Sequence, residues 1–250
     1  MHFNRHLSPK SALLACVLAI SVHTTLLGQE TTNRLPPTQV MIDTSILAAF
    51  VDEPCHHFEE ARATLIAMDP RLAATHLRTS AAFLKLEAAR ATPQGRVPLV
   101  ASARELANLA EAVEQGSVRE ASSLDGAFAR AHYALAAHHC LKAAHRCCWS
   151  NRPRSQAESK RASHDLQAAA KHLERASWWA HQELDTDTKE LLKSSRLAAD
   201  ALDASGDQSY DKASRAIMAL GNKLEQLTGR KIMIAPPVTE ADDLGPSIFR

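Results

Sequence analysis

Four histidines near the middle of the chain are spaced so that a helical hairpin would bring them together in pairs. They lie in two alanine-rich stretches with helical periodicity, about residues 118–149 and 154–184, separated by a short segment that begins at Asn151. In an antiparallel hairpin, residues at equal distances from the turn face each other. The pairs predicted in this way are His132 with His172 and His139 with His164.

Imidazoles that face each other across two helices are a common way to bind a transition metal. His132 and His139 are seven residues apart, which is two helical turns, so they share one face of their helix. Imidazole is a good ligand for zinc, copper and nickel. Because two turns span about 10 Å, one ion would be held by one facing pair rather than by all four rings. The sequence predicts a metal site drawn from His132, His139, His164 and His172.

A structural role for these histidines is the competing interpretation. The apolar stripe of the first stretch has two further histidines among its packing positions, Leu124, Phe128, Ala131, Leu135, His138, Leu141 and His145. Histidine is often partly buried in this way, with a single hydrogen bond. None of the four candidate ligands has a second histidine four residues further on, the spacing that would pair two ligands on one helix. Both interpretations stay open at this point.

Sequence motifs of several catalytic classes are missing. The chain has no Cys-x-x-Cys-His sequence for covalent haem, no Gly-x-Gly-x-x-Gly and no Walker loop. A di-iron bundle needs two Glu-x-x-His units, and the single match, Glu53 to His56, is interrupted by Pro54. Cys140 directly follows His139, but neighbouring side chains on a helix diverge by about 100° and cannot act as a catalytic pair. We therefore expect that the protein is not an enzyme.

The composition of the chain favours helices throughout. Aromatic residues make up 4% of the 250 residues and the 8 glycines are scattered singly, whereas alanine and leucine fill the periodic positions. Such a pattern is typical of helices, and no strand-like alternation of any length interrupts it. We expect an all-α fold in which antiparallel helical hairpins form a bundle or a short hairpin stack, with extended segments at both ends.

Proline, glycine and capping residues predict where these helices begin and end. Pro54 is expected to end a short helix, and Asp69 is expected to cap the start of another. Gly116 stands at the usual glycine position after a helix, and Asp187 with Glu190 predicts a capping box. Besides the two stretches of the central hairpin, the expected helices span about residues 44–52, 56–68, 70–91, 98–115, 187–206 and 208–228.

A short internal repeat connects two of these helices. Residues 73–77 read Ala-Ala-Thr-His-Leu, and residues 169–173 read Ala-Ala-Lys-His-Leu. The repeat places His76 and His172 at the same position in the second helix of a predicted hairpin. Alanine-rich helices match easily by chance, so the repeat is weak support for a duplicated hairpin.

The first 29 residues have the pattern of a cleaved export signal. Arg5 and Lys10 precede an apolar run over residues 12–22, and small and polar residues follow from Gly28. The run is too short for a membrane span, which takes roughly 20 apolar residues. We expect a periplasmic or secreted protein with no stable membrane span after cleavage. A lipoprotein anchored at Cys16 is the lesser alternative, because it would leave a very short apolar stretch before the cleavage point.

The chain that remains is expected to fold as one helical domain. We expect residues 30–53 to be an extended lead-in with a short helix, residues 54–229 to be the helical domain and residues 230–250 to be an extended tail. Loss of the signal removes two basic residues and no acidic residue, which changes the formal charge from +1 to −1. A chain so close to neutral has no general attraction for nucleic acid, so we expect none as a partner.

The cysteines and tryptophans bear on partners and cross-links. Only Cys55 lies where a disulfide could form, because the other three cysteines share one helical stretch. Those three are Cys140, Cys147 and Cys148.

One of the adjacent residues Trp178 and Trp179 is expected to fill the core. Trp178 is the candidate anchor for a protein partner, since aromatic residues dominate the binding energy of interfaces.

Three functions are compatible with these patterns. The first hypothesis is an exported, non-catalytic binding or scaffolding protein that acts through protein–protein contacts. The alternative is a periplasmic or secreted protein that binds Zn, Cu or Ni through histidines of the hairpin over residues 124–184. An enzyme of unrecognised type ranks third. Apart from these metals, no cofactor is expected.

Overall fold

The computed structural model describes residues 44–148, 155–204, 207–232 and 234, with the backbone alone for residues 44–53, 207 and 208. These residues form seven helices and no strand, so the predicted all-α fold is confirmed. The expected export signal with Cys16, the turn at Asn151 and most of the C-terminal tail lie outside the described residues. No helix in the described part of the chain combines the length and apolar character needed to cross a membrane.

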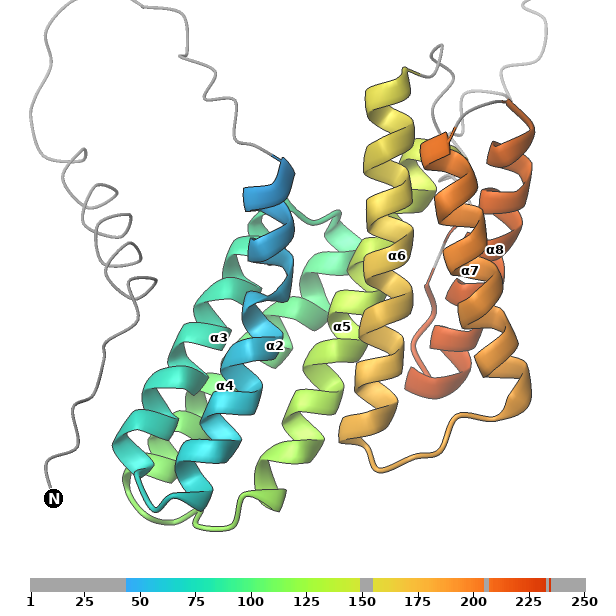
Figure 1. Ribbon diagram of the computed structural model, residues 1–250. Coiled ribbons are helices and arrows are strands. Elements are labelled where there is room, and N and C mark those ends of the chain that lie inside the picture. Colours follow the sequence, from blue (N-terminus) through green and yellow to red (C-terminus); the bar gives the residue numbers. More distant parts are fainter. Residues whose placement is uncertain (1–43, 149–154, 205–206, 233, 235–250) are drawn as a thin grey trace, which may run out of the picture. The chain divides into compact units, whose positions relative to one another are not determined.

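Consecutive helices lie side by side and run in alternating directions (Figure 1). This arrangement is the stack of antiparallel hairpins that the sequence predicts. The helices are α2 (Thr44–Ile66), α3 (Pro70–Arg90), α4 (Pro93–Glu114), α5 (Ser122–Cys147), α6 (Gln156–Trp179), α7 (Thr186–Ala204) and α8 (Asp207–Thr228).

Helix α5 lies between two groups of helices and is buried on nearly all sides. Of its 26 residues, 18 are buried. Phe128 and Leu135 pack in a core with α2, α3 and α4, while Cys140 and Ala144 pack in a second core with α6, α7 and α8. Alanine supplies much of the α5 surface, and its short side chain lets neighbouring helices approach from several directions. Polar residues of α5 therefore lie inside the protein, where each needs a partner.

Several predicted helix ends are confirmed. The Asp69 side chain accepts a hydrogen bond from the backbone N–H of Leu72 at the start of α3. Gly116 follows α4 with a φ of 73°, and Gly229 follows α8 with a φ of 64°. Glycine adopts this left-handed conformation without steric cost, which explains its position after both helices.

The predicted break at Pro54 is wrong, because α2 continues through this residue. A proline inside a helix removes one backbone hydrogen bond but does not prevent the flanking turns from forming. Pro54, Cys55 and Phe58 are all buried, so packing against the core compensates for the lost hydrogen bond.

Two other helix starts differ from the predictions. Helix α4 begins at Pro93 rather than near residue 98, because the Thr92 side chain accepts a hydrogen bond from the Gly95 backbone N–H. At α7 the residue that accepts from the backbone is Asp185, which bonds to Thr188 at 2.6 Å. The expected cap, Asp187, lies in the first turn instead. In both cases an acceptor side chain a few residues earlier satisfies the first N–H groups.

The arms of the central hairpin are shorter than predicted. Helix α5 starts at Ser122 rather than near residue 118, and α6 ends at Trp179 rather than near residue 184. The chain leaves α6 through His181, whose φ is 53°. The backbone N–H of Gln182 then bonds back to the carbonyl of Ser177, which closes the helix end.

The beginning of the C-terminal tail packs on the second core. Ile234 is buried and Ile232 is partly buried against the side chains shared by α5, α6, α7 and α8. A Cβ atom placed on Gly221 of α8 would overlap the Cδ1 atom of Ile234. The glycine therefore gives the tail room to lie directly on the α8 backbone.

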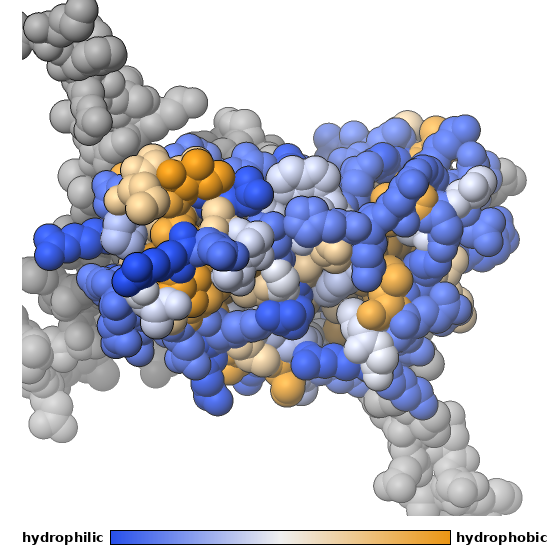
Figure 2. Space-filling view, turned by 90° about the horizontal axis from the view of Figure 1, so that it is seen from below, coloured by the Kyte–Doolittle hydropathy of each residue, from blue (hydrophilic) through white to orange (hydrophobic). Residues whose placement is uncertain are grey.

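Apolar side chains are exposed at the end of the helices that is lowest in Figure 1. Figure 2 views this end and shows hydrophobic side chains gathered on its left part, over the group of helices that contains α2 and α3. Three large exposed apolar residues lie in and beside the turn between these two helices: Ile66, Met68 and Leu72.

Candidate metal centre

The predicted pairing of His132 with His172 is confirmed. The two rings lie on α5 and α6, and their Nδ1 atoms are 3.1 Å apart. Their exposed fractions are 0% and 1%, so both rings are inside the protein. Since one nitrogen must donate and the other must accept in a hydrogen bond, the two neutral rings hold different tautomers when no ion is present.

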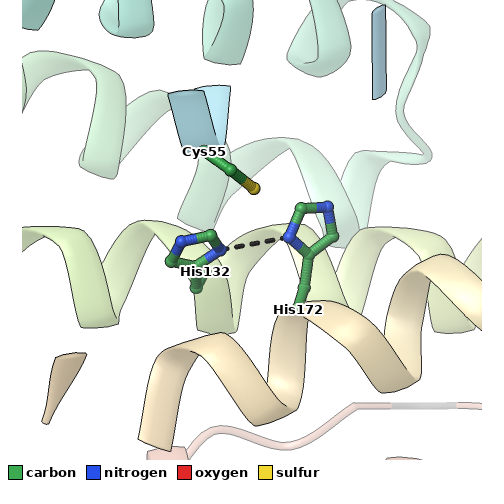
Figure 3. A group of neighbouring side chains, drawn as sticks. All are labelled: Cys55, His132 and His172. Atoms are coloured by element: carbon green, nitrogen blue, oxygen red, sulfur yellow. Dashed lines mark hydrogen bonds between the residues drawn. The ribbon is translucent and has the colours of Figure 1, made fainter. Parts of the chain in front are cut away.

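Cys55 of α2 completes a group of three donors with this pair. One donor atom from each of Cys55, His132 and His172 lies within 4.8 Å of the other two. In Figure 3 the sulfur atom points toward the two rings, which come from the two arms of the hairpin. Within the described part of the chain, this is the one place where three or more histidine, cysteine or acidic side chains converge in this way.

Phe58 explains how α2 brings Cys55 to the pair. Phe58 is one turn after Cys55 on the same face of α2, and it is fully buried. Its ring stacks on Phe128 at a centroid distance of 4.6 Å and meets His132 edge-on at 5.2 Å. The sequence offered Cys55 only as a disulfide candidate, because no spacing rule relates α2 to the distant hairpin. The apolar residue one turn after it was the available signal.

The predicted pairing of His139 with His164 is wrong. His139 instead faces Asp165, with 3.1 Å between Nδ1 and the carboxylate oxygen, while His164 is exposed. The hairpin register differs from the prediction by one residue at this level. Neighbouring side chains on a helix diverge by about 100°, so this difference turns Asp165 inward and His164 outward. His139 also stacks on His172 at 5.6 Å, and so lies beside the donors without joining them.

Charged residues surround the centre on the α5 side. The buried carboxylate of Asp165 forms ion pairs with Lys142, at 3.3 Å, and with Arg146. On an adjacent face of α5, His138 Nε2 lies 3.0 Å from the carboxylate of Glu87 on α3. The hydrogen bond with His138 lowers the pKa of Glu87 to about 2. These carboxylates are therefore already engaged by cations or by imidazole.

Burial keeps the two imidazoles of the centre uncharged. Desolvation, followed by the neighbouring ring and nearby cations, lowers the pKa of His132 and of His172 well below the usual range. Neutral imidazole is the form that binds metals, because its lone pair is available. No hydrogen-bond partner reaches the Nε2 atom of either ring within the described structure. The contact between the Nδ1 atoms is thus the interaction that fixes their tautomers.

The spacing of the two nitrogens suits a bound ion. A tetrahedral ion with metal–nitrogen bonds of 2.0–2.1 Å holds two ligand nitrogens about 3.3 Å apart. The observed 3.1 Å is close to this value. An ion can therefore replace the shared proton with a small outward movement of the rings.

A similar histidine pair connects α2 and α3. The Nδ1 atoms of His57 and His76 are 3.0 Å apart. His76 occupies the position of His172 in the internal repeat, so both copies of the repeated segment place a histidine against a second histidine on the preceding helix. Burial, followed by the charge of His76, lowers the pKa of His57 to about 4. This pair is not part of any three-donor group in the described residues.

The remaining candidate residues separate into buried and exposed ones. Trp179 is buried and meets Phe128 edge-on at 4.8 Å, while Trp178 is 56% exposed. The expectation that one tryptophan fills the core is confirmed. None of the four described cysteines forms a disulfide, so the bridge considered for Cys55 is not formed. Desolvation raises the pKa of Cys140 to about 12, which makes its thiol unreactive.

No protein-family model, curated protein or solved structure matches this chain.

Proposed function

We propose that the protein binds one transition-metal ion through Cys55, His132 and His172. The observation that carries the proposal is the convergence of three donor atoms, from three different helices, within 4.8 Å of one another. Thiolate and neutral imidazole together suit zinc and copper. The proposed ligand set keeps two of the four histidines predicted from the sequence and replaces the other two by a cysteine.

The surroundings of the centre favour holding an ion over catalysis. The exposed fractions of Cys55, His132 and His172 are 7%, 0% and 1%. A catalytic ion keeps one coordination position open to water or substrate, whereas a structural or storage ion is enclosed by protein. The proposed function is therefore non-catalytic binding. An exported location, as expected from residues 1–29, belongs to the same proposal, since the cell envelope exposes proteins to these metals.

Metal stoichiometry tests this function. The purified protein is stripped with a chelator and titrated with Zn²⁺ or with Cu(I) under anaerobic conditions, and the metal retained after gel filtration is measured. We expect one ion per chain. The variants Cys55→Ser and His172→Gln should retain far less, because removal of one of three ligands lowers affinity steeply.

Two controls make the result specific. His164→Gln changes an exposed histidine on the same helix as His172, so it should bind as much metal as the unmodified protein. Circular dichroism should show equal helical content for all variants. The proposal fails if the unmodified protein retains no ion, or if His164→Gln loses as much metal as Cys55→Ser.

A second candidate function is contact with a protein partner near the C-terminal end of α6. It is favoured by Trp178, which is 56% exposed although it is a large aromatic residue. Exposed tryptophan is typical of interface hot spots. Cross-linking in the native host should then give an adduct that Trp178→Ala abolishes. Leu197→Ala, which alters another exposed apolar residue, should leave the adduct in place. An adduct that survives Trp178→Ala argues against this surface.

A further inference from the structure

We propose that the ion held by Cys55, His132 and His172 is Cu(I) rather than a divalent ion. This inference rests on the proposed function and specifies the ligand of the same site. It follows from the charge of the donors, their number and the apolar surroundings that enclose them.

The charge of the donor set matches a monovalent ion. A cysteine thiolate carries one negative charge and two imidazoles carry none, so Cu(I) gives a neutral complex. Zn²⁺, Ni²⁺ or Cu²⁺ would leave one net positive charge on the complex. An uncompensated charge inside a protein is costly, because neither water nor a counter-ion solvates it. On binding, the Cys55 thiol releases its proton to solvent, and a sulfur–copper bond replaces the sulfur–hydrogen bond.

The nearby carboxylates are already engaged. The three-donor group contains no acidic residue. Asp165, which faces the neighbouring His139, is bound by Lys142 and Arg146. Glu87 is bound by His138 and lies 3.9 Å from Arg90. The charge of Asp165 is therefore balanced by two cations, whereas the negative charge of Glu87 still acts on His172 from outside the donor group.

Two cations affect the charge at the site. Lys171 and Arg175 of α6 both act electrostatically on His132. Arg175 also pairs with Glu59 of α2 at 3.0 Å, and both side chains are partly exposed. Lys171 therefore adds positive charge near the site, whereas the charge of Arg175 is largely balanced by Glu59.

The number of donors points the same way. Zn²⁺ in closed protein sites takes four ligands in a tetrahedral arrangement. The centre offers three, and the fully buried ring of Phe58 lies edge-on against His132. Thiolate sulfur suits both Cu(I) and zinc, so it is the number of donors that favours Cu(I), which does not require a fourth ligand.

An anaerobic competition between the two ions tests the inference. The protein is loaded with Zn²⁺ and then titrated with the coloured complex of Cu(I) and bicinchoninate. The loss of colour measures the copper that passes from the complex to the protein. We expect Cu(I) to displace Zn²⁺ ion for ion, with a preference of roughly 1,000-fold or more, as the cost of a buried net charge implies. Retention of Zn²⁺ against excess Cu(I) overturns the inference and leaves the proposed function intact. Failure of both ions to bind overturns the proposed function itself.

A charge-changing variant provides an independent check. His172→Asp replaces a neutral donor by an anionic one, which makes the zinc complex neutral and the Cu(I) complex negative. The preference for Cu(I) should fall by at least roughly tenfold relative to the unmodified protein. An unchanged preference contradicts the charge argument. If this variant does not fold, as judged by circular dichroism, the competition with the unmodified protein decides the question alone.

Discussion

The buried carboxylate of Asp165 compensates the positive charges of two side chains. It is 4% exposed and lies against His139, Lys142 and Arg146, all from α5. The two cationic side chains are each 27% exposed, so they are partly withdrawn from water on the same side of the hairpin. When a buried partner is removed, the charges that remain are left without compensation. Asp165 is therefore expected to be the most sensitive position of this charged group.

We predict that Asp165→Asn lowers the free energy of unfolding by about 3–5 kcal/mol, the range for breaking a buried ion pair. Urea denaturation at pH 7 measures the change. Glu174→Gln is the matched control, because it breaks an exposed pair with Arg196 and should cost at most about 1 kcal/mol. Similar losses in the two variants would mean that Asp165 contributes no more than a surface carboxylate.

The carboxylate of Glu87 should make the protein sensitive to acid. Its pKa in the folded protein is about 2, against 4.5 in its ordinary state, chiefly because of the hydrogen bond with His138. Between these values the unfolded chain binds a proton that the folded protein does not. The stability that Glu87 contributes is therefore complete above about pH 4.5 and is lost as the pH falls toward 2.

The test compares Glu87→Gln with the unmodified protein by denaturation between pH 6 and pH 3. Because glutamine does not titrate, the slope of stability against pH below 4.5 should decrease in the variant, by up to about 1.4 kcal/mol per pH unit. Glu111→Gln, a change at an exposed position on α4, should leave the slope unchanged. Parallel curves for Glu87→Gln and the unmodified protein would rule out this source of acid sensitivity.

Sequence periodicity predicted the pair His132 and His172 correctly and the pair His139 and His164 incorrectly. The difference has a physical reason. The position of a turn predicts which helical levels meet, and that was sufficient for His132 and His172. It does not predict the rotation of each helix to within one residue, and that rotation decides between His164 and Asp165. Cys55 was beyond this method, because its position depends on how α2 packs on a hairpin that begins almost 70 residues later.

At the scale of the helices, the sequence predicted a helix end correctly where only one residue could serve as its cap. Asp69 and Gly116 each had no close competitor and were placed correctly. At α7, Asp185 and Asp187 compete for the same role, and sequence alone does not show which of them reaches the backbone. Pro54 was misplaced because the rule against proline in helices describes a local cost, which the burial of Pro54 and Phe58 offsets.

Two helical glycines should respond oppositely to the same substitution. Gly126 of α5 is exposed, and an added Cβ would meet only the flexible Arg130 side chain, at 3.4 Å. Gly126→Ala should stabilise the protein by roughly 0.5–1 kcal/mol through helix propensity. Gly221→Ala should destabilise it by about 1–3 kcal/mol, because the new Cβ overlaps Ile234.

A double variant identifies the cause of the second effect. In the background of Ile234→Ala the overlap is removed, so Gly221→Ala should then cost nothing or stabilise the protein. Thermal denaturation of the four proteins gives the coupling between the two positions. If the two changes are additive, the beginning of the tail does not pack on α8 as the structure describes.

On the scale of the whole chain, the proposed ion would connect the two groups of helices across α5. Cys55 belongs to α2, which packs in the first core, and His172 belongs to α6, which contributes mainly to the second. In the absence of an ion, these two helices are joined by the Arg175–Glu59 pair and by the contacts that both make with α5. A metal with ligands on α2, α5 and α6 should therefore stabilise the region where the two cores meet.

We predict that loading with Cu(I) slows amide hydrogen exchange in α2 and α6 more than in α8. Ligand binding to the folded state stabilises it by about 2.7 kcal/mol at a free concentration one hundred times the dissociation constant. That stabilisation should appear first in helices that open locally without the ion and that carry its ligands. Exchange in α8, which carries none, should change only to the extent that global unfolding is suppressed. The same comparison on Cys55→Ser should show no slowing in α2. Equal slowing in all helices would mean that the ion acts only on global unfolding and does not join α2 to the hairpin.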